Sequence, residues 1–175
     1  MDIRTIINGR ITLGDIRSVC CRCSGAENDN EKAALFALIH DTDDRVSYNA
    51  LWIFTHFSPD DSRWLDDKRN EIIDTLLTTG HTGKRRLMLT LLDRMNICAT
   101  QVRSDYLDFC LSKINSTEPY GIRALCIRQS FAQCRFYPEL IAELNAELER
   151  IELGASSRAI LTTKRIILNK IARLK

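Results

Sequence analysis

Glycine and proline are scarce in this sequence, which has 7 glycines and 3 prolines among 175 residues. All-β folds need many tight turns and usually more of both residues, so the scarcity favours long helices. Sustained alternation of apolar and polar residues is also missing, which predicts essentially no β-sheet. Hydrophobic residues make up 45% and charged residues 27% of the chain, as in an ordered globular protein.

Long apolar runs are absent too, since no stretch approaches the roughly 18 residues that a membrane span requires. The first residues, Met1 to Arg4, lack the basic-then-apolar layout of a signal peptide. We therefore expect a cytoplasmic protein with no membrane partner. The seven cysteines have irregular spacing, and we interpret them as buried thiols in a reducing compartment.

The sequence also lacks the short motifs that carry common chemistries. It has no His-Glu-x-x-His for a metalloprotease, no Gly-x-Ser-x-Gly for a hydrolase and no glycine-rich phosphate loop. The cluster Cys20-Cys21-x-Cys23 has no second cysteine or histidine pair nearby, as a zinc site would require. We therefore expect no cofactor, no metal and no enzymatic activity.

What the chain does contain is apolar residues at helical spacing. Val46, Ala50, Ile53, Phe54 and Phe57 fall on one stripe of a helix that Pro59 follows. The same reasoning predicts an all-α protein of about eight helices. Nine segments fit this pattern, close to that number, at 12–23, 30–40, 45–57, 65–78, 82–95, 102–114, 119–134, 138–153 and 157–174, and residues 2–8 fit a further short helix.

The helix starts repeat along the chain. Equivalent second positions are Ser47, Arg85, Arg123 and Arg158, with steps of 38, 38 and 35 residues. A second helix follows each of the first three starts. This period predicts one solenoid domain over 1–175, with helix-pair repeats at 43–80, 81–117 and 118–154, irregular helices or a cap at 1–42 and a basic capping helix at 155–175.

The start Asp43-x-x-Val46-x-x-x-Ala50 and the recurring Arg85, Arg123 and Arg158 resemble the HEAT-repeat family, and armadillo-like repeats are the near alternative. The resemblance implies a short right-handed α-α superhelix. It also implies that the repeated arginine bonds to neighbouring repeats and holds the stack together.

Charge is distributed unevenly. Residues 27–74 carry twelve acids and five bases, whereas residues 153–175 carry six bases and no acid. Such asymmetry can orient a partner. Trp52 is expected in the core, and Trp64 is a candidate interface anchor. A basic stripe joins it as a possible binding surface, which gives the set Trp64, Arg85, Arg86, Arg123, Lys164 and Arg165.

These observations favour a non-enzymatic adaptor or scaffold that binds another protein or a peptide in the groove or at the edge of the solenoid, as HEAT-like proteins usually do. The first alternative is a nucleic-acid-binding protein with a basic concave face, in the manner of the HEAT-like DNA alkylation-repair glycosylases. A sequence pI of 8.2 is low for that class. The second alternative is a self-associating structural protein.

Overall fold

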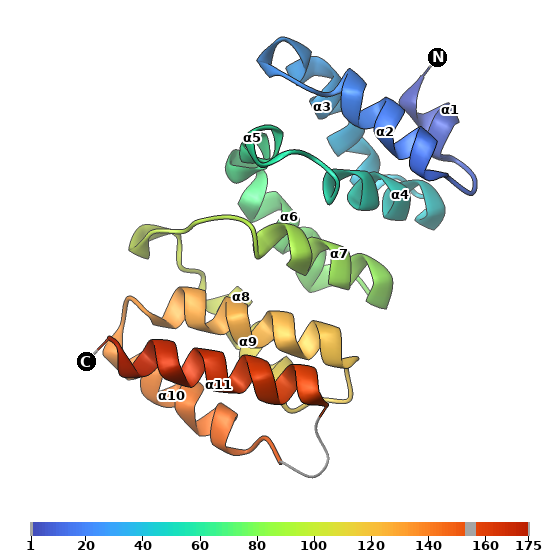
Figure 1. Cartoon of the computed structure of the whole chain (residues 1–175). Coiled ribbons are helices and arrows are strands. Elements are labelled where there is room, and N and C mark those ends of the chain that lie inside the picture. Colours follow the sequence, from blue (N-terminus) through green and yellow to red (C-terminus); the bar gives the residue numbers. More distant parts are fainter. Residues whose placement is uncertain (1, 153–156, 175) are drawn as a thin grey trace. The chain divides into compact units, whose positions relative to one another are not determined.

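The computed structural model describes residues 2–152 and 157–174, and within these ranges all regular structure is helical, with no strand (Figure 1). The all-α prediction is therefore confirmed. The α-helices are α1 (Ile3–Ile7), α2 (Leu13–Arg22), α3 (Asp29–Ala37), α4 (Asp44–Phe54), α5 (Pro59–Ser62), α6 (Arg69–Thr78), α7 (Thr82–Leu92), α8 (Ser104–Ile114), α9 (Tyr120–Cys134), α10 (Pro138–Glu149) and α11 (Arg158–Ala172).

One predicted helix starts later than expected. The apolar pattern placed its start at Leu65, whereas α6 begins at Arg69. Residues Arg63–Lys68 wind instead as a 3₁₀ turn that follows the short helix α5. Leu65 is buried from this tighter turn, so its apolar contact does not require an α-helix at that point.

The chain divides into two compact units, unit 1 (Met1–Leu91) and unit 2 (Leu92–Lys175). In unit 1, helix α4 contacts α1, α2 and α3. The predicted stripe on this helix and after it, from Val46 to Phe57, is buried. Asn49 is buried as well, and its side-chain amide donates to the carbonyl oxygens of Ile7 and Gly9, both at 2.9 Å. These bonds tie the N-terminal segment to the first repeat.

Unit 2 has two layers of helices. α9 packs against α11, α8 packs against α10, and α9 also contacts both α8 and α10. We refer to the pairs as the α9–α11 layer and the α8–α10 layer. One apolar core lies within the unit and includes residues of all four helices, such as Leu111, Ile127, Leu144 and Ile167. This arrangement is the stacking of helix pairs that the repeat predicted.

The last helix buries fewer apolar residues than its sequence suggests. Ile160, Ile167 and Ile171 point into the core, whereas Leu168 and Leu174, which could also have packed inward, are 37% and 52% exposed. Residues three and four apart share a helix face, and Leu168 shares its face with Arg165 and not with Ile167. The outer surface of α11 is therefore both basic and partly apolar.

Candidate functional site

Arg85 and Arg123, two members of the predicted basic stripe, contact the helix that precedes their own. The Arg85 guanidinium donates Nη2–H to the carbonyl oxygen of Thr79 at 2.9 Å, just after α6 ends. Arg123 donates Nε–H to the carbonyl oxygen of Ile114, the last residue of α8, at 2.8 Å. Carbonyls at a helix C-terminus lack intrahelical partners and attract cations. Both arginines therefore link successive repeats.

The third arginine of the series differs. Arg158 is exposed at the start of α11, and Lys164, further along the same helix, reaches back to the carbonyl oxygen of Ile151 at 3.5 Å. Arg165 is exposed and lies with Arg158, Leu161 and Thr162 around a shallow depression on α11. Arg158 and Arg165 are therefore accessible to a partner, whereas Arg85 and Arg123 are half-buried and bonded to the backbone.

The two tryptophans lie in unit 1. Trp64 is half-buried, with its ring 5.9 Å from that of Phe36 and the Lys68 ammonium 5.6 Å from its centre. It therefore packs against α3, the helix that contains Phe36. Trp52 was expected in the core, but it is half-buried, between Tyr48 and His56. Val46, Ala50 and Ile53 form the buried stripe of α4, and Trp52 lies on a different face of that helix. Its side chain is therefore only partly covered.

The six predicted residues do not form one cluster within either unit. Trp64, Arg85 and Arg86 belong to unit 1, where they lie on the 3₁₀ turn before α6 and on α7, with Arg86 exposed. Arg123, Lys164 and Arg165 belong to unit 2 and lie in the α9–α11 layer.

A groove in unit 2 brings together residues that the sequence analysis did not single out. It has a volume of about 330 Å³ and is bounded by the segment 93–97, by α9 with the residue that follows it, and by α11. Phe131 and Ile167 are buried at its floor, and Arg128, Arg135 and Lys170 are exposed at its rim. We call it the unit 2 groove.

A carboxylate of the chain itself, that of Asp93, lies at one end of this groove. Asp93 accepts Nε–H of Arg128 at 2.9 Å and the amide of Gln129 at 3.1 Å. Gln129 is buried, and its carbonyl oxygen accepts the Tyr106 hydroxyl at 3.1 Å. This network fixes the Arg128 guanidinium at the rim and pairs its charge with the Asp93 carboxylate. Arg135 is fixed too, because it donates to the carbonyl oxygen of Ile97 at 3.1 Å.

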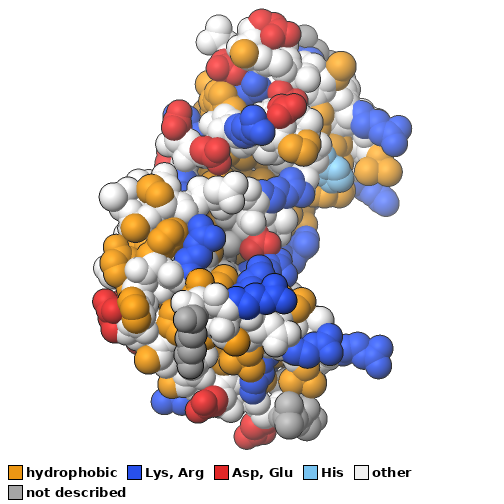
Figure 2. Space-filling view, turned by 60° about the vertical axis from the view of Figure 1, so that its left-hand side comes forward, with side chains coloured by type: hydrophobic (Ala, Val, Ile, Leu, Met, Phe, Trp, Pro, Cys, Tyr) orange, Lys and Arg blue, Asp and Glu red, His pale blue; other side chains and the backbone are white. Residues whose placement is uncertain are grey.

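The two layers of unit 2 carry opposite charge. The helices α9 and α11 contain six bases and no acid, whereas α8 and α10 contain six acids and one base. Figure 2 shows Lys and Arg side chains gathered on part of the surface that unit 2 forms. Such a separation of charge favours an anionic partner on one layer and disfavours it on the other.

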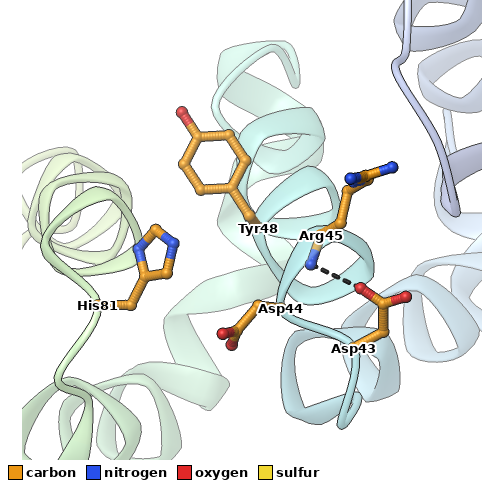
Figure 3. A pocket seen from close by; sticks show the side chains of 5 residues that line it. All are labelled: Asp43, Asp44, Arg45, Tyr48 and His81. Atoms are coloured by element: carbon orange, nitrogen blue, oxygen red, sulfur yellow. Dashed lines mark hydrogen bonds between the residues drawn. The ribbon is translucent and has the colours of Figure 1, made fainter.

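A second, more open cavity lies in unit 1 and is lined by Asp43, Asp44, Arg45, Tyr48 and His81 (Figure 3). Its polar groups serve the starts of α4 and α7. Asp43 accepts the backbone N–H of Arg45, and His81 Nδ1 accepts that of Lys84. The Lys84 ammonium bonds to Asp44 at 2.6 Å, which lowers the pKa of that carboxyl. We therefore interpret the polar groups that line this cavity as caps of the two helices, with a structural role.

The prediction that the cysteines are buried thiols is wrong for two of the seven, because Cys21 and Cys98 are exposed. Cys20 is half-buried, and the other four are buried. Burial raises the pKa of the Cys20 and Cys23 thiols to about 11 in each case. Over the described residues, no group of three or more His, Cys, Asp or Glu side chains is placed to hold a metal ion. No described helix is long and apolar enough to cross a membrane.

Comparison with known proteins gives one match. No curated protein and no solved structure matches the chain. The family model of the HEAT repeat domain matches residues 3–171, which covers both units and every predicted repeat. Together with the paired helices and the arginines that link them, this match shows that the chain belongs to the HEAT repeat domain family.

Proposed function

We propose that this chain is a non-enzymatic protein-interaction module, an adaptor or scaffold, that binds an acidic segment of a partner protein on the α9–α11 layer. HEAT repeat proteins commonly take part in protein interactions, which supports the general class. The observation that carries the specific proposal is that the two helices of this layer contain no acid and expose four basic side chains, those of Arg128, Arg158, Arg165 and Lys170.

One feature favours an acidic protein over a nucleic acid as the partner. The exposed outer residues of the layer include Ile166 and Leu168, which suit an apolar contact with protein side chains.

The test compares a fluorescent acidic peptide with a DNA duplex of similar charge. We expect the peptide to bind and the double variant Arg158→Glu/Arg165→Glu to weaken it by about tenfold. The control is Arg150→Glu, which reverses one charge next to α10, where the side chain is 68% exposed, and it is matched to each single variant, Arg158→Glu and Arg165→Glu. The control should leave binding unchanged. Equal losses in both variants, or no peptide binding, would refute the proposal.

Nucleic-acid binding is the second candidate, because the same basic layer also suits phosphates. A duplex whose phosphates contact the four exposed basic side chains should lose affinity about a hundredfold between roughly 50 and 200 mM salt. Tight duplex binding with that salt dependence, together with weak peptide binding, would favour this candidate over the acidic protein partner.

A further inference from the structure

We propose that the unit 2 groove binds a short acidic segment through one large apolar side chain, which enters the groove while flanking carboxylates pair with its rim. This inference rests on the proposed function and specifies the part of the partner that the α9–α11 layer recognises. It assigns a role to residues from three separate parts of the chain, the segment 93–97, the end of α9 and the second half of α11.

The walls supply the apolar contact, above a floor that belongs to the core. Phe131 and Ile167 come from the two helices of the layer and are 9% and 1% exposed, so both are anchored in the core of unit 2. Met95, Ile97 and Ala132 are half-buried at the walls. A leucine or aromatic side chain placed there would be removed from water on several sides, which is the usual setting of an interface anchor.

The rim supplies cations in defined positions. Arg128 is already paired with the Asp93 carboxylate, so the rim offers an incoming carboxylate chiefly Arg135 and Lys170. Arg135 is held both by the carbonyl oxygen of Ile97 and by stacking on Phe136, 4.7 Å from the ring centre. The Lys170 ammonium lies 5.8 Å from the centre of the Phe131 ring, above the floor. Positions fixed in this way reduce the entropy lost when a carboxylate pairs with them.

The size of the groove limits the occupant. A volume of about 330 Å³ is at the lower end of the range for ligand pockets, roughly 300–1,000 Å³, so it accommodates one large side chain with its neighbours. The combination of half-buried apolar walls with cations at the rim fits an amphipathic acidic segment better than a purely polar polyanion, which would leave the apolar walls uncovered.

The experiment uses the full chain and two peptides that differ at one position. Both contain the same aspartates, and the central residue is leucine in one and serine in the other. We expect the leucine peptide to bind about tenfold more tightly in fluorescence anisotropy. Equal affinity would overturn the groove inference and leave the proposed function standing, because acidic peptides would still bind. Binding of neither peptide would overturn both.

Variants then locate the contact. Ala132→Phe fills the groove without changing charge, so it should remove the preference for leucine and leave the affinity of the serine peptide unchanged. Lys170→Glu, at an exposed position, should weaken both peptides, and it provides a test that does not depend on repacking around residue 132. Retention of the full leucine preference in Ala132→Phe would overturn the inference.

A photoreactive leucine at the central position gives a direct readout. Cross-links mapped by mass spectrometry are expected in residues 93–97 and 128–135, which bound the groove. Cross-links confined to other segments would place the anchor elsewhere and would contradict the inference.

Discussion

Arg123 donates Nε–H to the carbonyl oxygen of Ile114, which lies nine residues earlier in the chain. Arg123 is the second of the three arginines that recur at equivalent positions of the repeat. Arg85 makes the corresponding bond to Thr79 from the position 38 residues earlier. In both cases a half-buried guanidinium joins the first helix of one repeat to the end of the preceding helix. This relationship indicates that the two arginines stabilise the stack.

Arg123→Ala should therefore destabilise the protein. The substitution leaves the Ile114 carbonyl without its charged donor, and such a bond contributes about 1.5–3 kcal/mol. Urea unfolding followed by circular dichroism would measure the change. Arg86→Ala is the control, because Arg86 is exposed on α7 and its loss should change the free energy of unfolding by less than about 0.5 kcal/mol. Equal effects in the two variants would contradict the structural role.

The repeat made most of the fold predictable. The arginine period and the apolar stripes located every helix from α2 to α11 except the short α5, since these signals depend on residues that lie close together in sequence. The start of α6 was wrong by four residues, because Leu65 is buried from a 3₁₀ turn and an apolar pattern does not distinguish that turn from an α-helix.

The binding surface was less predictable than the fold. The residues that line the unit 2 groove come from segments more than 30 residues apart, represented by Asp93, Arg128 and Lys170. No short sequence motif can therefore predict the groove. The bond between Asp93 and Arg128 could have been suspected only from opposite charges one repeat apart. The periodic spacing of the arginines, in contrast, indicated which basic residues have a structural role, because Arg85 and Arg123 contact the end of the preceding helix.

Lys32 is a buried base whose loss should destabilise unit 1. It is 3% exposed, and its ammonium donates to the carbonyl oxygen of Gly25 at 2.7 Å and to Asp29 at 2.9 Å, with Asp61 at 3.8 Å. Lys32→Met keeps the apolar stem and removes the charge, and we expect it to cost about 3 kcal/mol in urea unfolding.

The control for Lys32 is Arg63→Met, which removes a base from an exposed ion pair with Asp60 in the same unit. Exposed pairs contribute little, so its effect should stay below about 1 kcal/mol. If Lys32→Met were as mild as Arg63→Met, the bonds of Lys32 would not be important for stability.

Cys98 should be the fastest thiol to react with an alkylating reagent. It is exposed, and the hydroxyl of Thr100, 3.1 Å from its sulfur, lowers the pKa of the thiol. Burial raises the pKa of Cys134 to about 12, so that thiol should remain unlabelled in the folded protein. Iodoacetamide labelling with peptide mass mapping measures both rates. Thr100→Val should slow labelling at Cys98 and leave that at Cys21, also exposed, unchanged. Unaltered labelling at Cys98 would contradict the role of the hydroxyl.

Asp61 should contribute to the loss of stability in acid. Burial alone would raise the pKa of this carboxyl, but hydrogen bonds from Ser58, from the Gly25 N–H and from Ser24, with the charge of Lys32, lower it overall. A folded-state pKa below the ordinary value of 3.8 means that the unfolded chain binds the proton more readily. The stabilisation is therefore complete well above pH 3.8 and is lost as the pH falls through the folded-state pKa.

Asp61→Asn tests this prediction, because the amide keeps the shape of the side chain and removes the titration. At pH 7 we expect the variant to be less stable than the parent by about 1–3 kcal/mol in urea unfolding. The difference should shrink as the pH falls, since the parent loses the contribution of its ionised carboxylate. Asp60→Asn is the matched control one residue away, with a side chain 89% exposed, and its curve should parallel that of the parent at every pH. A difference between Asp61→Asn and the parent that stayed constant with pH would mean that this carboxylate does not contribute to acid unfolding.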